Sequence, residues 1–424
     1  MNRPNMASEL ARLNADAEAG VVEAQLQLAD LYENGLGVQE DYGRAAYWYQ
    51  KAAAQHSIKA YARLGQMYLR GIGVARDEYQ ACKLFHLAAE QDDMSAQANL
   101  AWCYQHGLGV AQDFDRAFKW NTLAAKQGHA GARYNLAYMY ANGVGTEQNA
   151  LEARYWYELA ADQGHMKAQL NLGLMYARGE GIEKDEEKAV HWYREAARQG
   201  YAKAQYNLAL MYSAGAGVEQ DDTKAFKWNQ QAAEQDYARA QFNLGLLYLN
   251  GLGVDQSDRK AAEYFQHASR QNYPKAYYQL GKMHASGRGM PVNEIAAANN
   301  FLEAATAGYA KAQYALGHLY VKGKGVQQDE HEACEWFLRS AKRGFHKAQH
   351  MVGVRYAKGQ GFQRNLVCAY AWLKLASEQC SERQIKQALT RVGEKLSSGQ
   401  IAEAEVLASV FSQGYVNKTR ELVS

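Results

Sequence analysis

A Gly-x-Gly loop recurs through the chain at a constant interval of 36 residues. Its first glycine stands at Gly35, Gly71, Gly107, Gly143, Gly179, Gly215, Gly251, Gly287, Gly323 and Gly359. No insertion interrupts this spacing. A fixed period of this length means that each unit is a supersecondary element that must stack on its neighbours to bury its apolar face. The sequence therefore predicts an array of ten repeats.

One unit, residues 165–200, has the pattern of two antiparallel helices. In its first helix, helix A, apolar residues such as Ala168 and Leu172 recur on one face. The Gly-x-Gly loop then ends helix A, because glycine adopts the backbone conformations of a tight exit. The second helix, helix B, carries Ala189 and Trp192 in its packing stripe. Each repeat is thus expected to be a helix-turn-helix.

Suitable capping residues stand at the start of helix B in every repeat and at its end in nine of the ten. Six positions after the marker glycine, the residue always has a side chain that caps helix N-termini well: Asp41, Asp77, Asp113, Asn149, Asp185, Asp221, Ser257, Asn293, Asp329 and Asn365. The closing position holds glycine or a residue that mostly tolerates left-handed backbone, namely Gly128, Gly164, Gly200, Gly308, Gly344, His56, Asp92, Asp236 and Asn272.

Two further slots predict how the helices pack. One slot of helix A is alanine without exception, which close helix contacts require: Ala24, Ala60, Ala96, Ala132, Ala168, Ala204, Ala240, Ala276, Ala312 and Ala348. One slot of helix B holds Trp48, Trp120, Trp156, Trp192, Trp228, Trp336 and Trp372. We interpret these indoles as core packing rather than a ligand cage, because they keep a fixed register.

The combined pattern A-x-A-Q-Y-N-L-G-x-x-Y-x-x-G-x-G-V-x-x-D-x-x-x-A-x-x-W-Y-x-x-A-A-x-Q-G resembles the Sel-one-like repeat, a relative of the tetratricopeptide repeat with a longer loop between its helices. The resemblance implies an all-α fold, a right-handed α-solenoid of ten 36-residue helix-turn-helix repeats with helical caps. It also implies an adaptor or scaffold that binds other proteins.

The expected organisation is a single array with a cap at each end. Residues 1–20 form an N-terminal capping helix, residues 21–380 the ten repeats, residues 381–415 C-terminal capping helices and residues 416–424 a frayed tail. Ser381 to Gln384 has the form of a capping box that opens the first of the C-terminal helices. Because no linker-like stretch interrupts the repeats, we expect no domain boundary.

Composition argues against several classes of function. A formal net charge of +2 does not suit a nucleic-acid binder that relies on phosphate contacts. Residues 1–19 do not have the pattern of a signal peptide, and no stretch is long enough for a membrane span. We therefore expect a cytoplasmic, monomeric protein without membrane insertion. The five cysteines form no CxxC pair and no metal-spaced cluster, and no catalytic motif is found, so neither cofactor nor metal nor enzymatic activity is expected.

The residues of helix A that point away from the stack are the candidate binding surface. One slot carries Tyr134, Leu170, Tyr206, Phe242, Tyr278 and Tyr314. Another carries Trp102, Tyr138, Leu174, Leu210 and Leu246, then turns polar at Lys282 and His318. An apolar stripe on a solvated face suggests a binding groove, which the resemblance places on the concave side. The alternative is that neighbouring repeats bury these side chains between them.

Polar residues accompany this stripe. A row of side-chain amides, Asn99, Asn135, Asn171, Asn207 and Asn243, has the donors and acceptors to grip an extended peptide backbone. The alternative is that these amides bond within the array. Beside them runs a basic row, Lys167, Lys203, Arg239, Lys275, Lys311 and Lys347, which favours an acidic partner segment.

These observations lead to one functional hypothesis and two competitors. We expect a protein or peptide partner to lie across repeats three to seven, with Tyr206 and Phe242 as anchors that contribute little to folding. A scaffold that holds a folded partner through its convex face or loops is the alternative, and an enzyme is the weaker one. Repeat eight lacks the usual aromatics at His284 and Asn300, so a weak point or hinge is expected at Gly287–Asn300.

Overall fold

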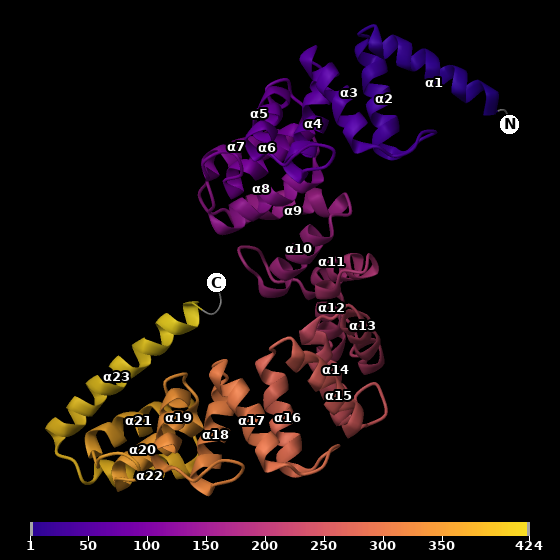
Figure 1. The fold of residues 1–424 in the computed structure, drawn as a ribbon. Coiled ribbons are helices and arrows are strands. Elements are labelled where there is room, and N and C mark those ends of the chain that lie inside the picture. Colours follow the sequence, from indigo (N-terminus) through magenta and orange to yellow (C-terminus); the bar gives the residue numbers. More distant parts are fainter. Residues whose placement is uncertain (1–2, 422–424) are drawn as a thin grey trace. The chain divides into compact units, whose positions relative to one another are not determined.

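The computed structural model describes residues 3–421, with side chains described for residues 8–412, and over that range all regular structure is α-helical (Figure 1). The helices are α1 (Arg3–Glu18), α2 (Val22–Asn34), α3 (Tyr42–Ala54), α4 (Ile58–Arg70), α5 (Glu78–Ala89), α6 (Met94–His106), α7 (Phe114–Lys126), α8 (Ala130–Asn142), α9 (Ala150–Asp162), α10 (Met166–Arg178), α11 (Glu186–Arg198), α12 (Ala202–Ala214), α13 (Asp222–Glu234), α14 (Ala238–Asn250), α15 (Asp258–Arg270), α16 (Pro274–Ser286), α17 (Glu294–Thr306), α18 (Ala310–Lys322), α19 (Glu330–Ala341), α20 (His346–Lys358), α21 (Leu366–Gln379), α22 (Arg383–Gly393) and α23 (Ser398–Glu421). The even-numbered helices α2 to α20 are the A helices, and α3 to α21 are the B helices.

Contacts group the described chain into two compact units. Unit 1 holds residues 3–204 and 216–219, and unit 2 holds residues 205–215 and 220–421. The division falls inside the sixth repeat, at α12, where the sequence contains no linker. In a repeat array each helix packs chiefly on the helices before and after it, so a grouping of this kind needs no linker.

The predicted caps are confirmed. In all ten B helices the expected side chain accepts a hydrogen bond from a backbone N–H of the first turn. Asp41, for example, accepts from the Arg44 N–H at 2.9 Å. Among the described residues, the non-glycine positions with positive φ are the four predicted at helix-B ends: His56, Asp92, Asp236 and Asn272. These caps depend on local sequence, which explains why they could be predicted.

The alanine slot is buried as expected, with every member at most 5% exposed. The tryptophan slot needs a correction. Trp48, Trp336 and Trp372 are buried, whereas Trp120, Trp156, Trp192 and Trp228 are half-buried. The residue after each tryptophan lies deeper, because it points about 100° further round the helix, towards helix A. The rings of this deeper slot, Tyr49, Phe85, Tyr157, Tyr193, Phe265, Phe301 and Phe337, are at most 5% exposed.

Buried glutamines join consecutive repeats, a feature that the sequence analysis missed. Gln169 of α10 donates through Nε2 to the carbonyl of Ala161, at the end of the preceding B helix, at 3.1 Å. Its Oε1 accepts from Gln199 Nε2 at 2.9 Å. The same glutamine pair recurs in both units, as Gln25–Gln55, Gln97–Gln127, Gln205–Gln235, Gln241–Gln271 and Gln349–Gln379. Each pair satisfies polar groups where repeats meet, which buried groups require.

The two ends of the array are covered by helices, although the domain boundaries themselves stay predictions. Ala17 of α1 is buried, and its carbonyl accepts from Gln25 Nε2 at 3.0 Å. At the other end, Trp372 stacks on Phe411 of α23 with ring centroids 4.4 Å apart. The helix α23 continues to Glu421, past residue 415, where we placed the end of the cap, and residues 422–424 lie outside the described residues.

The predicted capping box at the start of α22 is wrong. The N-cap is Glu382, and its side chain makes no capping hydrogen bond. The helix begins at Arg383, two residues after Ser381, so the serine hydroxyl is out of register with the first turn.

Candidate functional site

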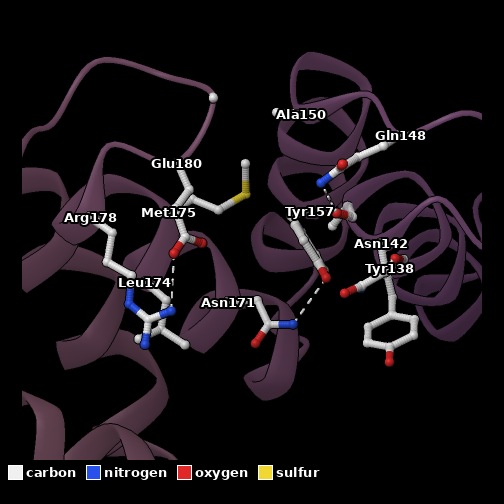
Figure 2. Close-up of a pocket in the computed structure, with 12 residues that line it drawn as sticks. Tyr138, Asn142, Gln148, Ala150, Tyr157, Asn171, Leu174, Met175, Arg178 and Glu180 are labelled. Carbon is white, nitrogen blue, oxygen red and sulfur yellow. Dashed lines mark hydrogen bonds and ion pairs between the residues drawn. The ribbon is translucent and has the colours of Figure 1, made fainter. Parts of the chain in front are cut away.

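A pocket of about 680 Å³ opens in unit 1, where the fourth and fifth repeats meet (Figure 2). Helices α8, α9 and α10 and the loops that follow α8 and α10 supply its lining, which is Tyr138, Ala141, Asn142, Gln148, Ala150, Tyr157, Asn171, Leu174, Met175, Arg178, Glu180 and Gly181. Three predicted surface residues, Tyr138, Asn171 and Leu174, thus come together at one site.

Asn171 connects the pocket to the buried core. Its Nδ2 donates to the hydroxyl of Tyr157 at 3.0 Å, as the dashed line in Figure 2 shows. Tyr157 is 2% exposed, and burial raises the pKa of its phenol well above the ordinary value. The phenol therefore stays neutral and positions the amide. This bond is the within-array role that was the alternative for the asparagine row, and it leaves the amide oxygen of Asn171 as an acceptor at the pocket.

The pocket combines an exposed aromatic ring with a polar rim. Tyr138 is 42% exposed, while Leu174 is half-buried. At the rim, Arg178 Nη1 pairs with Glu180 Oε1 at 3.1 Å. Gln148 donates to the Ala141 carbonyl at 2.9 Å, which fixes the loop after α8. The arrangement suits an apolar side chain attached to a polar backbone.

The two apolar slots differ in exposure. In the slot of Tyr138, Trp102 and Leu210 are also exposed, at 39% and 38%, and Leu174 and Leu246 are half-buried. In the slot of Tyr206, the rings are half-buried and contact the residue before the next A helix. The centroid distances within unit 2 are 5.5 Å for Tyr206–Tyr237, 5.2 Å for Phe242–Tyr273, 5.3 Å for Tyr278–Tyr309 and 5.3 Å for Tyr314–Phe345. Tyr134 of unit 1 stacks on His165 at 4.7 Å.

These contacts correct the expectation that Tyr206 and Phe242 stay outside the repeat packing. Phe242 also lies 5.6 Å from Phe265 of its own B helix. The missed signal is the aromatic residue that stands just before several of the A helices, which is Tyr237 or Tyr273 in these two cases. An aromatic there reaches back to the preceding repeat, so the half-buried row is part of the fold as well as of the surface.

The remaining predicted residues lie at the surface without fixed partners. Asn99, Asn135, Asn207 and Asn243 are half-buried, and the structure records no side-chain hydrogen bond between them and other described residues. The six basic residues of the row that begins at Lys167 are exposed, and no salt bridge is recorded for them within residues 8–412. Their charges are therefore available to a partner.

The stacked helix pairs, with apolar and amide side chains along the A helices, define an all-α helical repeat protein. The sequence pattern of the Sel1 repeat matches ten segments, residues 22–57, 58–93, 95–129, 130–165, 167–201, 202–237, 238–273, 274–309, 310–345 and 346–379. The chain belongs to the Sel1 repeat family, the Sel-one-like repeat whose pattern the sequence resembles. Proteins of this family are generally protein-interaction scaffolds.

Solved structures agree with this assignment. A protective antigen present in uropathogenic Escherichia coli strains, described as displaying an SLR fold, is 30% identical over 97% of each chain, with a TM-score of 0.64. A Sel1 repeat protein from Oxalobacter formigenes is 33% identical, covering 72% of this chain and 88% of its own, with a TM-score of 0.59. A search of curated proteins gives no match. Within the described residues, no helix has the length and apolar character needed to cross a bilayer.

Proposed function

We propose that this chain is a non-catalytic adaptor or scaffold that binds a peptide segment of a partner protein on the face of its A helices. The observation that carries the proposal is the pocket of Figure 2, which the exposed Tyr138 ring, Leu174 and the amide of Asn171 line together. Aromatic residues at such positions are typical anchors of protein interfaces. The family's general role in protein interaction supports the same conclusion.

The chemistry of the pocket indicates what it binds. An apolar side chain of the peptide would pack against Tyr138 and Leu174, and its backbone would bond to the amides at the rim. The exposed basic row supports an acidic flanking segment, because Lys167 lies on α10 beside the pocket and has no recorded ion pair in the described chain. Such exposed charges contribute modestly and are screened by salt.

A display library of random peptides tests the proposal directly. Peptides selected on the purified protein should lose affinity about 30-fold on Tyr138→Ala, which corresponds to roughly 2 kcal/mol for an aromatic anchor. The matched control is Tyr155→Ala, because Tyr155 has similar exposure, 51%, but lies on the B helix α9. Helicity measured by circular dichroism should be unchanged in both variants.

Binding on the B-helix face is the second candidate, and one observation favours it. Tyr47, Tyr79 and Tyr155 of the B helices are 50%, 65% and 51% exposed, so that face also carries rings with no role in the core. If the selected peptides respond to Tyr155→Ala and not to Tyr138→Ala, the binding surface is the B-helix face and the proposal is wrong.

A further inference from the structure

Three side chains of different chemical type converge where the tenth repeat meets the C-terminal helices. The candidate ligand atoms of His346, Cys380 and Glu382 all lie within 4.8 Å of one another. We propose that these three side chains form a binding site for one Zn²⁺ ion. This inference goes beyond the proposed function and does not depend on it, because the cluster lies in unit 2 and the peptide pocket in unit 1.

The fold brings the three residues together from three helix ends. His346 is the first residue of α20, Cys380 is the C-cap of α21, and Glu382 is the N-cap of α22. The extended backbone of Cys380, with φ −145° and ψ 125°, ends α21 and turns the chain into α22. His346 and Cys380 are half-buried and Glu382 is exposed, so the cluster is open to solvent on one side.

None of the three side chains is held by a recorded hydrogen bond or ion pair among the described residues, and the one ring contact is that of His346 with Phe345, with centroids 5.5 Å apart. Glu382 makes no capping hydrogen bond with α22. Within the described part of the chain, the structure records no hydrogen bond or salt bridge from the His346, Cys380 or Glu382 side chains, and Cys380 is a free thiol. Polar groups this close together that leave one another unbonded are suited to a shared cation.

The donor set matches the preferences of zinc. Imidazole nitrogen, thiolate sulfur and carboxylate oxygen are its usual protein ligands, at about 2.0–2.3 Å from the ion. In a tetrahedral site with those bond lengths, ligand atoms are roughly 3.3–3.8 Å apart. The three atoms must therefore approach one another by no more than about 1.5 Å, which rotation of the exposed Glu382 side chain and of the two half-buried side chains would supply.

A fourth ligand position is available. His350 lies one turn after His346 on α20, and residues four apart share a face of a helix. His350 is half-buried and is not among the side chains whose ligand atoms lie within 4.8 Å of one another. A water molecule, or His350 after rotation of its side chain, would complete four-coordination.

The charges around the cluster balance an added cation. A thiolate and a carboxylate contribute two negative charges, and the C-terminal end of α21 presents carbonyl groups that favour a cation. The ion would connect α20, α21 and α22. Binding would then stabilise the attachment of α22, because a ligand that binds only the folded state shifts the folding equilibrium.

Cobalt substitution tests the site in the full-length, reduced protein. After chelator treatment, Co²⁺ should bind with a stoichiometry of one and produce the near-ultraviolet band of a cobalt–thiolate bond, and Zn²⁺ should displace it. Cys380→Ser should remove the band. The control is Cys368→Ser, because Cys368 is a similarly half-buried free cysteine in α21 outside the cluster, and this variant should keep the band.

A second pair of variants covers the case in which Cys380→Ser does not fold. Glu382→Gln changes an exposed side chain, and by calorimetry it should weaken Zn²⁺ binding by at least the 10–100-fold that loss of a supporting group costs. Glu378→Gln, in the same region, should have no such effect. Absence of the cobalt–thiolate band in the wild type, a band that survives in Cys380→Ser, or unchanged zinc affinity in Glu382→Gln would each overturn the proposal.

Discussion

At the scale of single residues, the second glycine of each loop determines how closely one repeat approaches the one before it. Gly109 has a φ of +67°, and a Cβ at this position would collide with the backbone carbonyl of Glu78 at the start of α5. Gly344 also has a positive φ, +78°, but a Cβ there would meet nothing within 4 Å. Substitutions at these two positions therefore distinguish the loss of stability caused by backbone strain from the loss caused by a steric collision.

We predict that Gly109→Ala lowers the free energy of unfolding by about 3 kcal/mol, because backbone strain and a collision add together. Gly344→Ala should lower it by only about 1 kcal/mol, the cost of the left-handed conformation. Urea denaturation followed by circular dichroism measures both. Equal losses in the two variants would show that the loop has room to move away from α5.

The half-buried rings of the A helices give a second prediction at this scale. Phe242→Ala removes contacts with Phe265 and Tyr273 and should lower the free energy of unfolding by about 2–3 kcal/mol. Leu210→Ala, at a position that is 38% exposed, should cost less than about 1 kcal/mol. Thermal melting of both variants decides whether the ring row belongs to the repeat contacts. Similar melting temperatures in the two variants would show that Phe242 does not contribute to the packing between repeats.

At the scale of elements, the loop between α16 and α17 remains the predicted weak point. His284 has a buried Nδ1 without a partner among the described residues. Asn300 stands in the tryptophan slot, and its side-chain amide donates a hydrogen bond to the Ala296 carbonyl of its own helix at 2.8 Å. Arg288 stabilises the same loop: its side chain pairs with Asp258 at 2.9 Å and donates a hydrogen bond to the Leu249 carbonyl at 2.9 Å.

We predict that backbone amides of Gly287–Asn300 exchange hydrogen faster than those of the equivalent loop at Gly323, because His284 and Asn300 replace the aromatic residues usual in these slots. Arg288→Ala should increase the difference, since it removes the two bonds to the preceding repeat. Hydrogen exchange followed by mass spectrometry measures each loop in the same sample. Exchange as slow as in the neighbouring loops would remove the idea of a weak point.

At the scale of the whole molecule, the division into two units predicts which residues a destabilising substitution affects. In a repeat array stability is a sum of repeat and nearest-neighbour terms. Gly109→Ala should therefore raise hydrogen exchange mainly in unit 1, and Gly325→Ala, whose Cβ would collide with the Glu294 carbonyl, mainly in unit 2. A uniform increase over residues 3–421 in either variant would contradict this expectation.

The repeats, the two helices of each repeat and the caps of those helices could be predicted from the sequence alone. Asp41 and its equivalents cap through a bond to a residue three positions away, and His56 or Asn272 adopts a left-handed conformation set by its neighbours. These interactions are local, so each repeat contains all the residues that form its caps. The constant period of 36 residues repeats the pattern ten times, which makes it easy to recognise. The domain boundaries and the binding role of the asparagine row are still predictions.

Which side chains share a site depends on contacts between repeats, and the sequence pattern did not reveal these contacts. Asn171 bonds to Tyr157 of the preceding repeat, and Phe242 packs on Tyr273 of the following one. The deeper burial of Tyr193 than of Trp192 depends on the direction from which helix A approaches. His346 lies far from Cys380 in sequence, so no motif joins them. The packing of α20 against α21 and the turn into α22 bring the three side chains of the cluster together. Contacts between repeats depend on the stacking of helices, which the pattern within one repeat does not specify.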